Sequence, residues 1–74
     1  GESVKRLQDF LKYVGFLNEG EITGNFGDRT RQALIEFQKT HKIISSENDL
    51  GAGQVGPQTK SFIDKIISSQ KINV

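Results

Sequence analysis

The chain has 74 residues, enough for one small domain. It contains no cysteine and only one histidine, which excludes disulfides, cysteine metal centres and a histidine-based zinc site. The net charge is +1, with ten basic and nine acidic residues spread along the chain, and this balance argues against a nucleic-acid binder. No apolar stretch approaches the length of a membrane span, so membrane insertion is not expected.

The first predicted element is a helix over residues 4–14. Its apolar residues recur at spacings of three and four and share one face: Val4, Leu7, Phe10, Leu11 and Val14. Ser3 precedes the helix as an expected N-cap, and Gly15 follows it as an expected left-handed C-terminal cap. Residues 1–3 are therefore assigned to an N-terminal tail.

Two further helices are predicted, each after a polar loop that contains glycine. The second covers residues 28–41, with Asp28 in its first turn and His41 as a capping or packing residue at its end. The third begins at Pro57, because proline suits the first helical position. The domain is assigned to residues 4–68, and residues 69–74 are assigned to a C-terminal tail or linker.

The phrase Gly-x-apolar-Gly-x-x-Thr occurs twice, at residues 24–30 and again at residues 53–59. A helix with a glutamine beside a core position, Gln8 or Gln38, precedes each copy. We interpret the repetition as structural duplication, because one such unit cannot bury its apolar face alone. The glycine pairs are expected to turn the backbone where a Cβ would clash, and the glutamine amides to satisfy backbone groups of the loops.

These elements predict an all-α fold, a compact three-helix bundle with two glycine-rich loops and an internal pseudo-repeat. Phe26 and Val55, which lie between the glycines of each pair, are expected to fill the core beneath their turns. The complete predicted core is Val4, Leu7, Leu11, Val14, Phe16, Phe26, Ala33, Leu34, Phe37, Val55, Phe62, Ile63 and Ile66.

The ordered motifs of the chain resemble the peptidoglycan-binding domain family. The matching strings are Val4-x-x-Leu7-Gln8-x-x-Leu11-x-x-x-Gly15-Phe16, then Gly24-x-Phe26-Gly27-x-x-Thr30-x-x-Ala33-Leu34-x-x-Phe37-Gln38, then Val55-Gly56-Pro57-x-Thr59. The resemblance extends from Val4 to about Ile67. Two features depart from the family pattern: Lys42 stands where many members have glycine, and the loop over residues 42–53 is longer than usual.

The resemblance implies a noncatalytic module that anchors a hydrolase, transpeptidase or other cargo to the murein layer. The implied partner is peptidoglycan, through its glycan and its peptide stems. The implied location is extracytoplasmic, in the bacterial cell envelope or secreted. No cofactor is expected, and the chain is expected to act as a monomeric part of a larger multidomain protein.

Five residues are candidate ligand contacts: Arg29, Asn25, Phe26, Tyr13 and Asn18. Arg29 lies in the first turn of the second helix, where it can take a stem carboxylate in a bidentate way. Its structural alternative is a solvated arginine paired with Asp28 or a loop glutamate. Asn25 can bind through its amide or serve as a turn residue, and Phe26 can offer its ring to the ligand instead of filling the core.

Tyr13 falls off the main apolar stripe of the first helix and is expected to be partly exposed near Gly15. An amphipathic aromatic residue there suits a binding surface, and the alternative is a ring that lies over the edge of the bundle. Asn18 in the following loop is a similar candidate.

Catalysis is not expected. His41 has no nucleophile elbow or oxyanion motif to work with, and Glu19 and Glu21 share one loop without a desolvated pocket. The first alternative function is a protein–protein interaction module on the same fold; related prodomains of metalloproteases use a cysteine, which this chain lacks. The second alternative, a helix-turn-helix nucleic-acid binder, is disfavoured by the balanced charge.

Overall fold

The computed structural model of the chain describes residues 2–70. Helix α1 spans Glu2–Tyr13, the short 3-10 helix η1 spans Glu19–Glu21, α2 spans Asp28–Thr40 and α3 spans Pro57–Gln70. No strand occurs in residues 2–70. The predicted all-α fold of three helices is therefore confirmed, while residues 71–74 of the predicted C-terminal tail lie outside the described residues.

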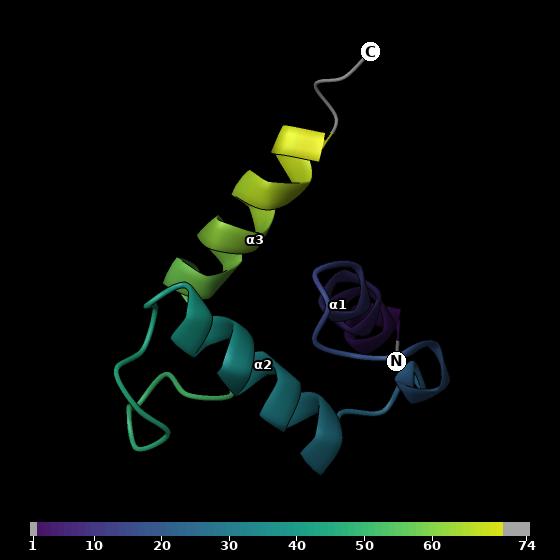
Figure 1. Ribbon diagram of the computed structural model, residues 1–74, viewed down its shortest axis with the longest axis horizontal. Coiled ribbons are helices and arrows are strands. Elements are labelled where there is room, and N and C mark those ends of the chain that lie inside the picture. Colours follow the sequence, from purple (N-terminus) through teal and green to yellow (C-terminus); the bar gives the residue numbers. More distant parts are fainter. Residues whose placement is uncertain (1, 71–74) are drawn as a thin grey trace.

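The three helices form one compact body. α2 and α3 make the two arms of a V, and α1 lies in its opening (Figure 1). The loop between α2 and α3 folds back along the outer side of α2. The radius of gyration is 12.0 Å, close to the value of about 11 Å for a compact domain of this length.

The main core forms where α1 and α2 meet. Its buried members are Phe10, Leu11, Leu17, Ala33, Leu34 and Phe37. The ring of Phe37 contacts that of Phe10 edge-on at a centroid distance of 5.3 Å. The His41 ring continues the stack, 4.7 Å from Phe37 and 5.2 Å from Phe62 of α3. Phe37 therefore lies at the centre of the ring contacts that join the three helices.

A second, smaller cluster holds the long loop against α2. It consists of buried Ile35, Ile44 and Ala52, with Ile43 packed against it. Short-range hydrogen bonds shape the loop into consecutive turns, such as those from the Ala52 N–H to the Asp49 carbonyl (3.0 Å) and from the Asp49 N–H to the Ser46 carbonyl (3.1 Å). The length that sets this loop apart from the family pattern is thus accommodated by a packed structure.

The first helix ends as predicted and begins earlier than predicted. Gly15 has φ 96°, and the Phe16 N–H donates to the Leu11 carbonyl (2.7 Å), which is the hydrogen bond of a glycine C-terminal cap. Ser3 lies inside α1, so its predicted N-cap role is wrong. The helix begins two residues earlier, at Glu2, whose carboxylate is favoured at the positive end of the helix dipole and pairs with Arg6 (3.7 Å).

The second helix ends with the same cap but without glycine. The Ile43 N–H donates to the Gln38 carbonyl (2.8 Å), and the Lys42 N–H donates to the Lys39 carbonyl (3.1 Å). Lys42 takes the left-handed conformation, with φ 58°, at the position where many family members have glycine. His41 is the C-cap residue and packs between aromatic rings, which confirms its predicted capping and packing roles.

The buried side chain of Gln8 binds the first glycine turn. Its Oε1 accepts from the Gly24 N–H (2.8 Å), and its Nε2 donates to the Asn25 carbonyl (3.1 Å) and to the Thr30 hydroxyl (2.8 Å). The amide of one side chain therefore joins the turn to the helix that follows it, and it meets the backbone groups that the turn leaves unpaired.

Gln38 repeats this arrangement at the second turn. Its Oε1 accepts from the Gly53 N–H (2.8 Å), and its Nε2 donates to the Gln54 carbonyl (2.9 Å) and to the Thr59 hydroxyl (3.1 Å). A further bond runs to the Gly51 carbonyl (3.0 Å). The predicted structural role of both glutamines is confirmed, and the threonine of each phrase is bound by the glutamine amide.

Two details of the predicted turns are wrong. Phe26 and Val55 are 42% and 47% exposed, because the glutamine amides, and not these apolar side chains, bind the turns from inside. Only the first glycine of each pair has a left-handed backbone, with φ 83° at Gly24 and 74° at Gly53. A Cβ on Gly27 or Gly56 would meet nothing within 4 Å, so no clash requires glycine at these positions.

Candidate functional site

Arg29 is held by the loop over residues 14–27, which contains η1 and which we call the η1 loop. Its Nε donates to Glu21 Oε2 (2.6 Å), and its Nη2 donates to the Phe16 carbonyl (3.2 Å). The pairing with a loop glutamate, the structural alternative for this residue, is thus what the structure shows. A guanidinium carries five N–H donors, so other donors of Arg29 remain for a ligand.

The carboxylates of the η1 loop are also engaged. Glu21 Oε1 accepts from the Asn18 N–H (2.8 Å), and this bond, followed by the one from Arg29, lowers the pKa of Glu21 below its ordinary value. Lys12 pairs with Glu19 (2.5 Å), which raises the pKa of Lys12 and lowers that of Glu19. These contacts tie the η1 loop to α1 and α2.

The structure joins two of the five predicted ligand-binding residues and places Phe26 elsewhere. Arg29 and Asn18 meet at Glu21, which bonds to both. The side chain of Tyr13 is 61% exposed, which confirms its predicted exposure. Asn25 is also exposed, while its backbone carbonyl accepts a hydrogen bond from Gln8. Phe26 is not part of the Glu21 network, and it lines a groove between α1 and α3 instead.

The groove between α1 and α3 is largely apolar and has a volume of about 560 Å³. Leu7 and Phe10 of α1 and Ile63 of α3 line it, together with the two turn residues Phe26 and Val55. The side chains that were predicted to plug the core therefore lie on one exposed apolar surface.

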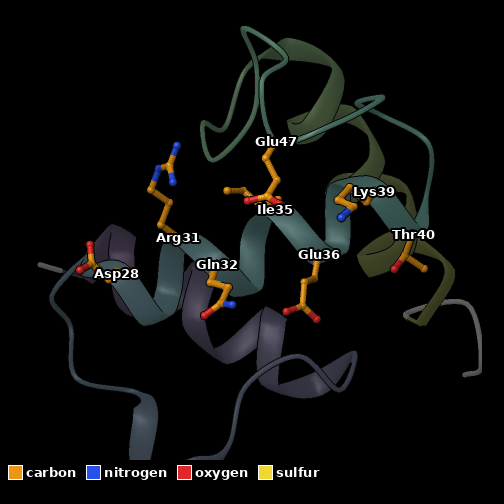
Figure 2. Close-up of a pocket in the computed structure, with 8 residues that line it drawn as sticks. All are labelled: Asp28, Arg31, Gln32, Ile35, Glu36, Lys39, Thr40 and Glu47. Atoms are coloured by element: carbon orange, nitrogen blue, oxygen red, sulfur yellow. The ribbon is translucent and has the colours of Figure 1, made fainter.

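A second groove of about 620 Å³ runs along the outer face of α2 (Figure 2). It is lined by charged side chains of both signs: Asp28, Arg31, Glu36, Lys39 and Glu47. Glu47 reaches it from the loop over residues 42–53, and the other four project from α2. We call this surface the α2 groove.

The helix repeat sorts the α2 groove into two rows. Arg31, Ile35 and Lys39 are spaced four residues apart and form one row, on the side of the loop. The other row has the same spacing and contains Asp28, Gln32, Glu36 and Thr40. One row therefore carries Arg31 and Lys39 and the other carries Asp28 and Glu36, with the buried side chain of Ile35 between the two cations.

The charges of the α2 groove do not pair with one another. Among residues 2–70, ion pairs join Arg6 to Glu2, Lys12 to Glu19, Arg29 to Glu21 and Lys60 to Asp64, all outside this groove. Asp28 and Arg31, like Glu36 and Lys39, are three residues apart on the helix and close enough in sequence to pair. Their hydrogen-bonding groups are left to solvent or to a ligand.

The second glycine turn helps to place Arg31. A Cβ on Gly53 would lie 2.9 Å from both Cγ and Nε of Arg31, so the side chain of Arg31 passes directly over this glycine. Sequence reasoning missed the α2 groove, because its outer wall comes from the loop whose shape the family pattern does not fix. The available signal was the eight-residue spacing of like charges along α2, Asp28 with Glu36 and Arg31 with Lys39.

Two kinds of site are not found in the described part of the chain. Residues 2–70 contain no cluster of three or more histidine, cysteine or acidic side chains that could hold a metal ion. None of their helices is long and apolar enough to cross a membrane.

The chain is thus a small three-helix module, with the apolar groove between α1 and α3, the charged α2 groove and two turns bound by buried glutamines. Residues 1–63 match the model of the family described as "Putative peptidoglycan binding domain", and the chain belongs to this family. The resemblance seen in the sequence motifs is thereby confirmed, and it places the chain in the context of the cell wall. Comparisons with curated proteins and with solved structures returned no match.

Proposed function

We propose that this domain binds bacterial peptidoglycan noncovalently and without catalysis, and that it anchors an attached enzyme or other cargo to the cell wall. The observation that carries the proposal is the α2 groove, with unpaired charges of both signs on a member of this family. The peptide stems of murein offer carboxylates, amides and amines, which are the partners that such a groove can take.

The charges of the groove suggest how a stem would bind. Arg31 and Lys39 would receive carboxylates, and the opposite row would receive amines or amide N–H groups. Contacts between exposed charges contribute little individually, about 0–1 kcal/mol each. Binding of one domain is therefore expected to be weak and to gain strength when the domain is tethered to a second binding or catalytic module.

A second contact surface is proposed at the η1 loop, from Tyr13, Asn18, Asn25 and Arg29. It adjoins the α2 groove at the first turn of α2, where Asp28 lines the groove and Arg29 reaches Glu21. Its remaining donors would bind the glycan or the far end of a stem. Phe26 would contact the ligand only if the polymer also reached the groove between α1 and α3.

Sedimentation with purified insoluble murein tests the function and separates the two surfaces. We expect the unaltered domain to sediment, and the double variant Arg31→Gln, Glu36→Gln to sediment markedly less. The matched double variant Arg29→Gln, Asn25→Ala would lose less, because its arginine is already engaged by Glu21. If the unaltered domain stays in solution at every salt concentration, the proposal is wrong.

The alternative of a protein–protein interaction module has one observation in its favour. The groove between α1 and α3 exposes Phe26 and Val55 side by side with apolar helix residues. If Phe26→Ser abolished murein binding and the α2-groove variants had no effect, murein would be recognised by the apolar groove and not by the α2 groove. Failure to bind murein at all would favour a protein partner.

A further inference from the structure

We infer that the α2 groove selects stem peptides in which one carbon carries both a free amine and a free carboxylate, as the side-chain end of diaminopimelate does. The inference rests on the proposed function, because it names the chemical class of murein that the same groove would take. It is drawn from the arrangement of the charges on α2.

Each end of the groove combines one cation with one carboxylate. Asp28 and Arg31 form one end, and Glu36 and Lys39 form the other, each pair three residues apart. Neither pair closes into an ion pair, although Lys60 and Asp64 on α3 approach within 3.6 Å at a spacing of four. In Figure 2 the side chain of Arg31 points toward the loop and that of Glu36 points away from it.

A group placed between such a pair meets a cation on one side and a carboxylate on the other. A carbon that carries both an ammonium and a carboxylate group can pair with the cation and the carboxylate of the groove at the same time. A lysine stem brings an amine without the neighbouring carboxylate, so the cation of the pair stays unpaired. A stem with an amidated side-chain carboxyl group has the same deficit, and a neutral glycan uses neither charge.

The end formed by Asp28 and Arg31 is the better prepared of the two. The side chain of Arg31 lies over the backbone of Gly53, where a Cβ would come within 2.9 Å of it. This contact restricts the side chain, so less conformational entropy is lost when it binds. The two ends are about 12 Å apart along the helix at 1.5 Å per residue, and Ile35 between them can support the rest of the peptide.

The test compares three disaccharide-tetrapeptides in titrations of the domain followed by amide chemical shifts. One carries diaminopimelate, one carries lysine at the same position, and one carries diaminopimelate with an amidated side-chain carboxyl group. We expect the first to bind about two- to fivefold more tightly than the other two, as removal of one exposed charge contact allows. Shifts are expected at residues 28–39 and at Glu47.

Variants locate the preference. Arg31→Gln with Asp28→Asn should bring the three affinities together, and both residues are exposed, so the fold should persist. The matched control is Lys60→Gln, because Lys60 follows Thr59 in the second phrase as Arg31 follows Thr30 in the first, and it lies outside the α2 groove. This control should keep the preference unchanged.

The outcomes separate the inference from the function it rests on. Equal binding of the three muropeptides, together with sedimentation on insoluble murein, overturns the inference and leaves the proposed function standing. The same holds if the preference persists in the Arg31→Gln, Asp28→Asn variant. Absence of binding to all three muropeptides and to insoluble murein overturns both.

Discussion

Gln8 and Gln38 are fully buried polar side chains in a domain too small to spare much stability. Each binds a glycine N–H with its oxygen, and a carbonyl and a threonine hydroxyl with its nitrogen. None of the buried side-chain nitrogen and oxygen atoms in the described residues lacks a partner. At the scale of the residue, each copy of the repeated phrase therefore supplies the N–H, the carbonyl and the hydroxyl that hydrogen-bond with one buried glutamine amide.

The first prediction concerns Gln38→Ala. The change leaves the Gly53 N–H and nearby carbonyls buried without partners, so we expect a loss of about 2–4 kcal/mol in the free energy of unfolding. Urea denaturation followed by circular dichroism measures it. The control is Gln32→Ala, exposed on the same helix, which should stay within about 0.5 kcal/mol. Equal stability of the two variants would contradict the proposed role of the amide.

The sequence predicted the structural role of the two glutamines correctly, but it predicted the burial of Phe26 and Val55, between the glycines, wrongly. Equivalent positions in the repeat pointed to a structural amide, which the structure confirms. Phe26 and Val55 were placed in the core because apolar residues are usually buried. The backbone groups of a turn require polar partners, however, and the glutamines supply these from inside while Phe26 and Val55 remain exposed.

At the scale of the element, the two long loops begin with the same type of helix cap. α1 uses Gly15 and α2 uses Lys42, each with a positive φ and with a hydrogen bond back across the last turn. A side chain in the left-handed region costs roughly 1–2 kcal/mol, so Lys42 is a strained position that glycine would relieve. The family pattern and the backbone geometry agree at this residue.

The second prediction follows from this strain. Lys42→Gly should stabilise the domain by about 0.5–1 kcal/mol, because the relief of strain exceeds the added freedom of the unfolded chain. Thermal unfolding should show a melting temperature higher by about 2–8 °C. Lys42→Ala keeps the Cβ while it removes the charge, and it should not stabilise. A rise of the same size in both variants would mean that charge, and not backbone conformation, is responsible.

The helices were predictable to within two residues, but the α2 groove was not. The periodic apolar residues define α1, α2 and α3 by local rules. The groove depends on the loop of residues 42–53, which buries Ile44 and Ala52 against Ile35 and brings Glu47 over α2. These contacts join residues that no local pattern relates. The sequence alone therefore placed the candidate site at the first glycine phrase, around Asn25, Phe26 and Arg29, with Tyr13 and Asn18 beside it.

At the scale of the whole molecule, α2 belongs to both copies of the pseudo-repeat. Thr30 of α2 is bound by Gln8 of α1, and Gln38 of α2 binds Thr59 of α3. Phe37 meets Phe10 on one side and reaches Phe62 through His41 on the other. The two copies therefore share a helix and a core, and neither has an apolar face that it can bury alone.

The last prediction is that the domain unfolds in one transition despite its repeat. Because α2 carries contacts to both other helices, loss of either copy removes partners from the other. In urea, amide signals of α1 and α3 should disappear with the same midpoint as the circular dichroism of the whole domain. Phe37→Ala should lower the free energy of unfolding by about 3–5 kcal/mol and shift both sets of signals together, whereas Leu50→Ala, at a site 94% exposed, should leave them in place. If the α3 signals were lost at a lower urea concentration than those of α1, the two copies would be separable units, and the shared core around Phe37 would not be what makes the fold cooperative.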